Sequence, residues 1–171
     1  MIDIAIATCS YHPELAPQDR GVIAELAGLG IRATPLIWTD ATASLDKFAA
    51  VVVQSTWDSH LDAPAFANWA RRVHARTALF NPLHLLEWNL NKRYLQDLEQ
   101  QGIPITPTLW VHAGSAVDLR REVSERGWTR FIIKPVVSAG ATETHIFDAD
   151  TMELAQATLD RLVTRVDLMV Q

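Results

Sequence analysis

Short apolar runs alternate with segments of helical periodicity along the first 80 or so residues, and this alternation limits the possible folds more than any other feature. The runs are IDIAIATC, IRATPLIW, FAAVVVQST and TALFN. The third run is almost purely apolar, as expected for a strand that is covered on both faces of a parallel sheet. Apolar residues at helical spacing separate the runs, at Val22, Leu26 and Leu29 and again between Pro64 and Arg76. Residues 1–80 are therefore predicted to form a doubly wound α/β domain.

The pattern of the chain changes after residue 80. The stretch LHLLEWNLNKRYLQDLEQQG follows Asn81-Pro82 and predicts one long helix that ends at Gly102. The segment IPITPTLWVHAG, with the unit boundary near residues 103–113, is predicted to form a connector and a strand. It leads to elements predicted at 115–126 (helix), 130–134 (strand), 142–148 (strand), 151–165 (helix) and 167–171 (strand). We expect a long helix and connector over 81–112 and an α+β unit over 113–171. A bare sheet strand is an unusual place for a domain to finish, so either Gln171 closes an edge of the sheet or, as we predict, this unit is truncated at its C-terminus.

Charge and composition exclude several classes of function. Fifteen Lys and Arg against twenty Asp and Glu give a net charge of −5, so a general nucleic-acid surface is not expected. No apolar stretch reaches the roughly 20 residues that span a bilayer, and the N-terminus lacks the basic region of a signal peptide. We therefore predict a cytoplasmic protein without a membrane partner. The single cysteine, Cys9, cannot form an internal disulfide, and a small buried thiol is favoured over a nucleophile.

Two weak motifs have structural explanations. Residues 28–33, GLGIRA, match the G-x-G-x-x-A pattern of dinucleotide-binding folds. These glycines close a helix and lead into a strand, so no dinucleotide site is predicted there. Asp58, His60 and Asp62 could ligate a metal, but alternate residues after a strand more often form a loop or cap a helix. No metal ligand is therefore nominated in this chain.

Small and polar residues follow two of the predicted strands. Residues 8–10 end the first strand, and residues 55–58, with the sequence STWD, end the third. Open α/β sheets bind ligands at the carboxyl ends of their strands, so both loops are expected to face one crevice. The alternative is that Trp57 covers the core and Asp58 caps the next helix. Both interpretations can hold together.

Lys134 carries the sharpest functional signal in the sequence. It ends the apolar run FIIKP on the same face as Ile132. Isolating its charge in a dry sheet would cost several kcal/mol. The ammonium must therefore reach water, pair with a carboxylate such as Glu143, or bind an anionic ligand. The small-residue loop VVSAGATET follows, and its backbone N–H groups at Ser138 and Gly140 could contact phosphate oxygens.

Lys92 provides a second cation. It projects from an otherwise apolar stripe of the predicted long helix, beside Trp88. If that stripe faces a neighbouring body, Lys92 and Lys134 point into the same space and together predict a nucleotide triphosphate clamp. The alternative is that the stem of Lys92 lies over Trp88 with its ammonium in water.

These segments resemble the ATP-grasp superfamily of carboxylate-amine and carboxylate-thiol ligases. The matching stretches are NLNKRYLQDLEQQGIPITPT, FIIKPVVSAGATET and LMVQ, after an N-terminal α/β unit. Together they cover the whole chain, but only the first half of such an enzyme. Within the superfamily, STWD and KPVVSAGATET look similar to O-ureido-D-serine cyclo-ligase-like proteins.

The resemblance implies an ATP-dependent ligase that forms a C–N bond through an acyl phosphate. Its cofactors would be ATP and Mg²⁺, and its other partner a small carboxylate or amino-acid-like substrate. The metal ligands of the family lie downstream of the last strand, so the chain alone is expected to be inactive. The alternative from another class is a non-catalytic nucleotide- or metabolite-binding module. The sequence does not decide between a monomer and a homo-oligomer.

The resemblance also assigns residues to the two ligands. The residues implied to bind ATP are Lys92, Lys134, Ser138, Ala139, Gly140 and Gln171. Those expected near the substrate, from the resemblance and from the shared crevice, are Thr8, Ser55, Thr56, Trp57 and Asp58.

Overall fold

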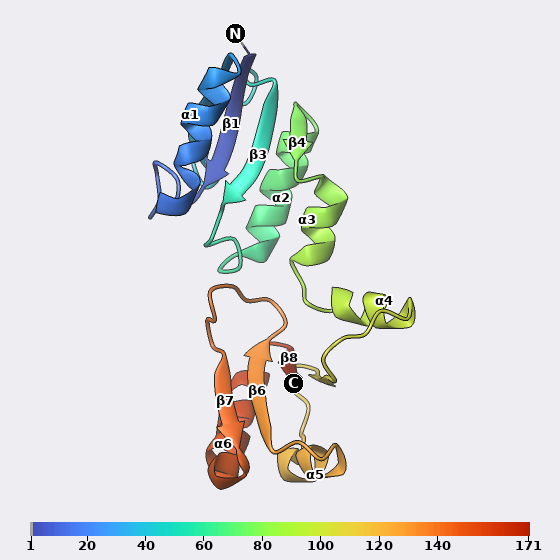
Figure 1. Ribbon diagram of the computed structural model, residues 1–171. Coiled ribbons are helices and arrows are strands. Elements are labelled where there is room, and N and C mark those ends of the chain that lie inside the picture. Colours follow the sequence, from blue (N-terminus) through green and yellow to red (C-terminus); the bar gives the residue numbers. More distant parts are fainter. Residues whose placement is uncertain (1) are drawn as a thin grey trace. The chain divides into compact units, whose positions relative to one another are not determined.

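The chain forms two compact units, each built around one four-stranded sheet (Figure 1). The structure is a computed structural model and describes residues 2–171. The units are Met1–Leu90 and Asn91–Gln171. The first sheet is parallel and the second is antiparallel, so the predicted α/β class, with an α/β unit followed by an α+β unit, is confirmed.

The strands of the first unit lie where the apolar runs predict them. Their order in the sheet is β2-β1-β3-β4. The bounds are Ile2–Thr8 (β1), Ile31–Ile37 (β2), Ala50–Ser55 (β3) and Ala78–Phe80 (β4). In the pairing of β1 with β3, Thr8 lies opposite Ser55. The two strand ends that carry small and polar residues are therefore neighbours at one edge of the sheet.

Helices cover both faces of this parallel sheet (Figure 1). They are η1 (Pro17–Asp19), α1 (Gly21–Gly28), α2 (Ala63–His74) and α3 (Leu83–Asn89). On the face of α2 and α3, Phe66, Trp69 and Val73 pack against buried residues of β1 and β3. Gly30, with a φ of 76°, follows α1 and leads into β2, which confirms that the glycine motif ends a helix.

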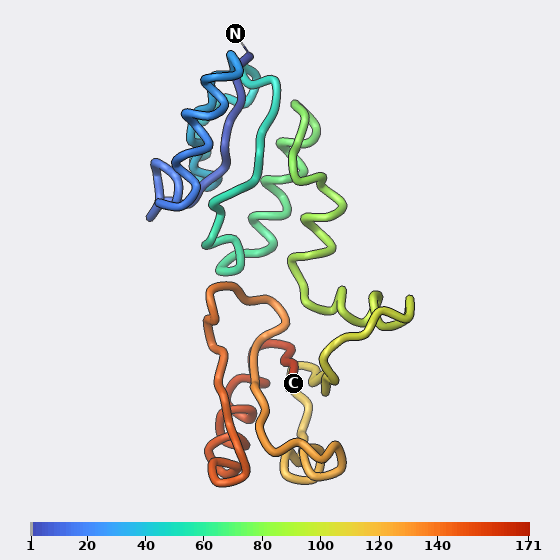
Figure 2. The backbone as a smooth tube through the Cα atoms, viewed as in Figure 1, coloured from blue at the N-terminus to red at the C-terminus, as the bar shows by residue number. Residues whose placement is uncertain are grey.

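The second unit has the strand order β5-β8-β6-β7. Its strands are β5 (Leu109–Val111), β6 (Arg130–Pro135), β7 (His145–Asp148) and β8 (Leu168–Val170). Its helices are α4 (Tyr94–Gln100), α5 (Leu119–Glu125), η2 (Ala149–Thr151) and α6 (Met152–Val163). Buried side chains of α5 and α6 join Phe131 and Ile133 of β6 in one apolar core. Figure 2 follows the loop that joins β6 to β7, which borders the candidate site.

Membrane-spanning helices are absent from residues 2–171, where no helix has both the length and the apolar character to cross a bilayer. The cytoplasmic location stays a prediction.

The single long helix predicted after Pro82 is wrong. The chain instead forms α3 and α4, separated by a turn from Leu90 to Arg93. In this turn the N–H of Lys92 donates to the carbonyl of Val136 at 2.8 Å, and the Asn91 side chain accepts from the N–H of Arg93 at 3.0 Å. These bonds replace the helical ladder, so Lys92 lies at a turn instead of on a helix stripe.

Two further boundaries differ from the prediction. The helix expected from residue 115 begins at Leu119, because the Asp118 carboxylate accepts from the N–H of Arg121 at 3.1 Å and acts as its N-cap. The strand expected from residue 142 begins at His145. Before it, two turns close with bonds from the N–H groups of Thr142 and Thr144.

The cap at Asp118 gives a test of this boundary. Asp118→Ala is expected to lower the free energy of unfolding by about 1 kcal/mol, because the first turn of α5 loses an acceptor. Ser115→Ala, at the residue where the sequence predicted the helix to begin, should change it by less than about 0.5 kcal/mol. Urea denaturation followed by circular dichroism measures both values. Equal effects of the two substitutions would contradict the cap.

Candidate functional site

Lys134 lies on the central strand β6 of the second unit with its side chain half-buried. Ile132 and Lys134 share the partly exposed face of β6, and Phe131 and Ile133 face the core, as the alternation predicts. The ammonium forms no ion pair or hydrogen bond with any residue of 2–171. Burial lowers the pKa of Lys134, so its charge is held in a place that disfavours it.

The carboxylate suggested as a partner for Lys134 is engaged elsewhere. Glu143 accepts from the ring of His145 at 2.9 Å and from the guanidinium of Arg161 at 3.3 Å. These partners hold the pKa of Glu143 below its usual value, His145 having the larger effect. The pairing of Lys134 with Glu143 is therefore not formed among the described residues.

Lys92 reaches the same region of the second unit from the turn before α4. Its Nζ donates to the carbonyl of Ser138 and, at 3.0 Å, to the Ser138 hydroxyl. That hydroxyl in turn donates to the carbonyl of Pro135 at 3.1 Å. Burial, and then the positive charge of Lys134, lower the pKa of Lys92. The structure thus brings the two ammonium groups close enough to repel each other, beside the start of the β6–β7 loop.

The β6–β7 loop leaves backbone donors open next to these cations. Ala139 and Gly140 are exposed, and their N–H groups donate to no backbone acceptor within 2–171. Gly140 has a φ of 58°, a conformation that glycine adopts without steric cost. Successive N–H groups in such a turn form a concave site that suits an anion.

Asp167 forms hydrogen bonds with three segments around Lys92. Its carboxylate accepts from the N–H of Ala113 and from the guanidinium of Arg93, each at 2.8 Å. Its backbone carbonyl accepts from the N–H of Val136 at 3.1 Å. The bond from Ala113 and then the bond from Arg93 hold the pKa of Asp167 below its usual value. The sequence reasoning missed Asp167, and the only local signal was an acid at the start of a predicted strand.

Gln171 is hydrogen-bonded to the second sheet through its backbone. Its backbone N–H and carbonyl exchange bonds with Ile132 of β6, at 3.1 Å and 2.8 Å. Its side-chain amide donates to the Thr108 hydroxyl at 2.9 Å. The role assigned to Gln171 near adenine stays a prediction.

At the sheet edge of the first unit, two of the nominated residues use their hydroxyls inside the protein. Thr8 and Ser55 are fully buried. The Thr8 hydroxyl donates to the carbonyl of His12 at 2.6 Å, and the Ser55 hydroxyl donates to Asp19 at 2.6 Å. Cys9 beside them is also fully buried, as a small core thiol is expected to be. The substrate roles of Thr8 and Ser55 stay predictions.

Asp58 and Trp57 do not play the structural roles suggested as alternatives. The N-cap of α2 is Asp62, whose carboxylate accepts from the N–H of Ala65, so the capping interpretation of Asp58 is wrong. Asp58 is only 8% exposed and accepts from the indole N–H of Trp38 at 2.5 Å.

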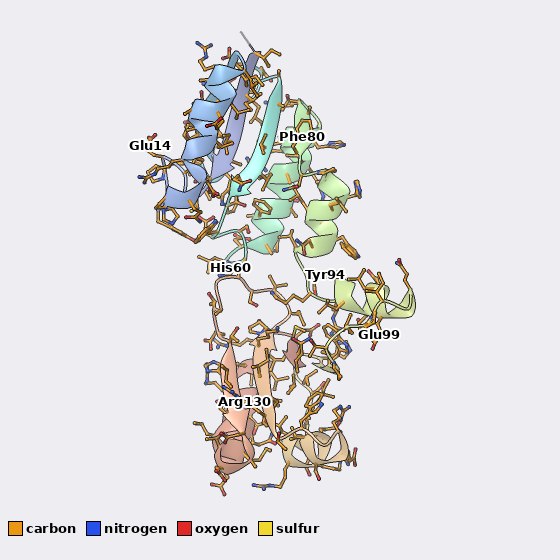
Figure 3. The ribbon with its side chains drawn as sticks, viewed as in Figure 1. Glu14, His60, Phe80, Tyr94, Glu99 and Arg130 are labelled. Atoms are coloured by element: carbon orange, nitrogen blue, oxygen red, sulfur yellow. The ribbon has the colours of Figure 1, made fainter. Side chains whose placement is uncertain are left out.

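Trp57 does not cover the core, because its side chain is 47% exposed. Its ring and that of His12 form a T-shaped pair, with 5.6 Å between ring centroids. Trp38 fills the core position instead, and Thr56 is buried beside this loop. His60, labelled in Figure 3, lies in the same loop.

Among residues 2–171, no group of three or more His, Cys, Asp or Glu is arranged to hold a metal ion. The metal ligands expected downstream of this chain stay a prediction.

Comparisons with known proteins agree on both units. Residues 4–81 match the family described as the N-terminal domain of D-cycloserine synthetase DcsG. The cycloserine biosynthesis protein DcsG of Streptomyces lavendulae is 32% identical over 138 residues, which cover 79% of this chain and 46% of that protein. The chain thus spans about half the length of the curated relative that it matches.

Solved structures extend the match to the second unit. The crystal structure of D-cycloserine synthetase DcsG superposes with a TM-score of 0.86 at 26% identity, covering 98% of this chain and 58% of that one. A RimK domain ATP-grasp protein of Sphaerobacter thermophilus gives 0.71 at 16% identity, covering 99% of this chain and 62% of that one. The chain belongs to the family of the cycloserine biosynthesis protein DcsG, and it shares its fold with an ATP-grasp protein.

A further solved structure shares the fold at low identity. D-alanyl-alanine synthetase A of Vibrio cholerae gives a TM-score of 0.71 at 10% identity, covering 99% of this chain and 58% of that one. At this identity the likeness shows the fold alone. This chain covers 58% of the length of each of the DcsG and D-alanyl-alanine synthetase A structures.

The unpaired, half-buried charge of Lys134 is expected to lower the free energy of unfolding of the chain. Because burial lowers its pKa, the charged form is less stable in the folded chain than in the unfolded one. This cost is full below the lowered pKa and disappears as the pH rises above the unfolded value of about 10.4. At pH 7 Lys134→Met is therefore expected to raise the free energy of unfolding by about 0.5 kcal/mol or more. Urea denaturation measures the change, with Lys47→Met as an exposed control that should stay within about 0.5 kcal/mol.

The contribution of Asp167 to the free energy of unfolding is expected to depend on pH. Its lowered pKa means that its contribution is full above the unfolded value of about 3.9 and is lost as the pH falls through the folded value. Asp167→Asn is expected to cost about 1 kcal/mol at pH 7 and progressively less below about pH 4. Denaturation curves from pH 7 to pH 3 give this difference. The exposed control Asp46→Asn should show none, and a constant cost of Asp167→Asn across the range would contradict the assignment.

Proposed function

We propose that the chain is part of an ATP-dependent ligase that forms a C–N bond through an acyl phosphate on an amino-acid-like substrate. The observation that carries this proposal is the pair of half-buried ammonium groups of Lys92 and Lys134, which no carboxylate of residues 2–171 neutralises. Keeping two such charges together is unfavourable unless an anion joins them. The similarity to the DcsG protein and to ATP-grasp structures supports the triphosphate of ATP as that anion.

In this proposal the second unit holds the nucleotide. Lys92 and Lys134 contact phosphate oxygens as point charges, and the loop residues Ser138, Ala139 and Gly140 close over them with their N–H groups. Gln171 begins the segment that hydrogen-bonds adenine. The two ammonium groups would stabilise the negative charge that spreads over the transferring phosphoryl group.

The proposed reaction has two steps. A carboxylate oxygen of the substrate attacks the γ-phosphorus, the bond from that phosphorus to the bridging oxygen breaks, and ADP leaves. An amine nitrogen then attacks the acyl carbon, the bond from that carbon to the phosphate oxygen breaks, and the nitrogen loses a proton. A closed site that excludes water protects the acyl phosphate from hydrolysis.

The first unit would supply the substrate side. Thr56, Trp57 and Asp58 follow β3, next to Thr8 and Ser55 at the carboxyl edge of the parallel sheet. Ligands of open α/β sheets bind at this edge. A substrate carboxylate held there would react faster because its position is fixed before the chemical step.

Nucleotide affinity tests the proposal directly. Isothermal titration of the 171-residue chain with ATP is expected to show binding that Lys134→Ala and Lys92→Ala each weaken by at least about tenfold. Lys47→Ala is the matched control, because Lys47 is an exposed lysine of the first unit, and it should bind ATP as the unchanged chain does.

Two competitors show whether the lysines act on phosphate. Tripolyphosphate should displace ATP from the unchanged chain, and any binding of adenosine should be the same in the Lys134→Ala variant. Circular dichroism confirms that each variant folds. ATP affinity that survives both lysine substitutions would overturn the proposed phosphate site.

A further inference from the structure

The backbone of Lys92 belongs to a closed ring of contacts within the second unit. The N–H of Lys92 donates to the carbonyl of Val136 at 2.8 Å, and the N–H of Val136 donates to the carbonyl of Asp167 at 3.1 Å. The Asp167 carboxylate accepts from the guanidinium of Arg93 at 2.8 Å. Since Arg93 directly follows Lys92 in the chain, the peptide bond between them closes the ring. Asp167 contributes both its backbone and its side chain to this ring.

The ring also connects Lys92 to the strand that carries Lys134. Strands β6 and β8 are paired, and the bond from Val136 to Asp167 continues this pairing past the last paired residues of the two strands. Lys134 belongs to β6 and lies two residues before Val136. The position of one lysine relative to the other therefore depends on the ring.

The side chains of Asp167 and Arg93 are held by further contacts. Asp167 uses Oδ2 for Arg93 and Oδ1 for the N–H of Ala113, at 2.8 Å. The guanidinium of Arg93 also lies 3.2 Å from Nδ1 of His112, and its Cζ is 5.6 Å from the ring centroid of Trp110. A planar guanidinium with partners on three sides keeps one orientation. It can therefore transmit the position of Asp167 to the turn that contains Lys92.

We propose that Asp167 is a positioning residue, which fixes Lys92 for contact with phosphate through Arg93 and Val136. A charge-assisted hydrogen bond from an ammonium to a phosphate oxygen depends steeply on the distance between the two atoms. Lys92 and Lys134 must meet the same anion, so a shift of the turn would weaken the contact of Lys92. This inference deepens the proposed function and rests on it for the identity of the anion.

The charge of Asp167 and its positioning role have opposite effects on ATP binding. A negative charge near an anion site repels phosphate, so electrostatics alone predicts tighter binding by Asp167→Asn. The positioning role predicts binding at least about fivefold weaker, measured by isothermal titration of the 171-residue chain. Asp150→Asn, at an exposed position of the second unit, is the matched control and should change ATP affinity by less than about twofold. Unchanged or tighter binding by Asp167→Asn would overturn the proposal.

A double-mutant cycle shows whether the effect acts through Lys92. In the Lys92→Ala background, Asp167→Asn is expected to change ATP affinity by less than about twofold, because the group that it positions is absent. An equal loss in both backgrounds would indicate a general weakening of the unit and would refute the positioning role. If Asp167→Asn fails to fold, the same cycle with Arg93→Gln decides, and Arg93→Lys should recover part of the affinity because it keeps a cation beside Asp167.

Amide hydrogen exchange followed by NMR tests the ring without nucleotide. Asp167→Asn is expected to speed exchange at the N–H of Lys92 at least about fivefold more than at the N–H of Gln171, which bonds to Ile132 in the sheet. Equal acceleration at both sites would show that the whole unit is destabilised and would reject the ring as the cause.

The two kinds of measurement separate this inference from the proposed function. Faster exchange at Lys92 in Asp167→Asn, with no ATP binding by the unchanged chain, would support the hold of Asp167 on Lys92 and reject the nucleotide clamp. ATP binding that depends on Lys92 but not on Asp167 would leave the ligase proposal in place and overturn the positioning role.

Discussion

The ammonium groups of Lys92 and Lys134 repel each other in a half-buried setting, and much of the second unit is arranged around that unfavourable pair. Burial lowers the pKa of both, and the charge of Lys134 lowers the pKa of Lys92 further. Among residues 2–171, the hydrogen-bond acceptors of the Lys92 ammonium are the carbonyl and the hydroxyl of Ser138, and neither is an anion. A core built for stability alone would not keep this arrangement, because an apolar residue at Lys134 would pack in the sheet without the cost of a desolvated charge.

The position of Lys92 depends on a helix that stops early. Its backbone N–H bonds to Val136 at the end of β6, and this is possible only because the chain leaves the helical path after α3. Asp167 then holds the turn by binding Arg93 with its carboxylate and Val136 with its carbonyl. The guanidinium of Arg93 also lies over the ring of Trp110, with 5.6 Å between its Cζ and the ring centroid. These contacts fix the base of the β6–β7 loop, while Ala139 and Gly140 at its outer part keep their N–H groups open.

Polar residues at the sheet edge of the first unit form hydrogen bonds inside the protein. Thr8 and Ser55 are adjacent in the sheet, and their hydroxyls donate to the carbonyl of His12 and to Asp19. Asp58, three residues after Ser55, is also buried, and its Oδ1 accepts from the indole N–H of Trp38. Sequence position placed all three residues at the ligand edge of a parallel sheet, but it could not show which partners their side chains would bind. Those partners depend on which atoms the fold brings within hydrogen-bond distance.

Local sequence patterns determined the strands of both sheets, the face of β6 on which Lys134 lies, and the glycine that ends α1. These features depend on the periodicity of neighbouring residues, which a sequence displays directly. Tertiary structure alone decided the break before Lys92, the link of Arg93 to Asp167 across 74 positions, and the contact of Asp58 with Trp38. Helical periodicity in residues 83–101 predicted one helix, but the N–H of Lys92 bonds instead to Val136, just after β6, and the N–H of Arg93 bonds to the Asn91 side chain. Hydrogen bonds between distant segments depend on how the elements pack, and the spacing of residues along one element does not contain that information.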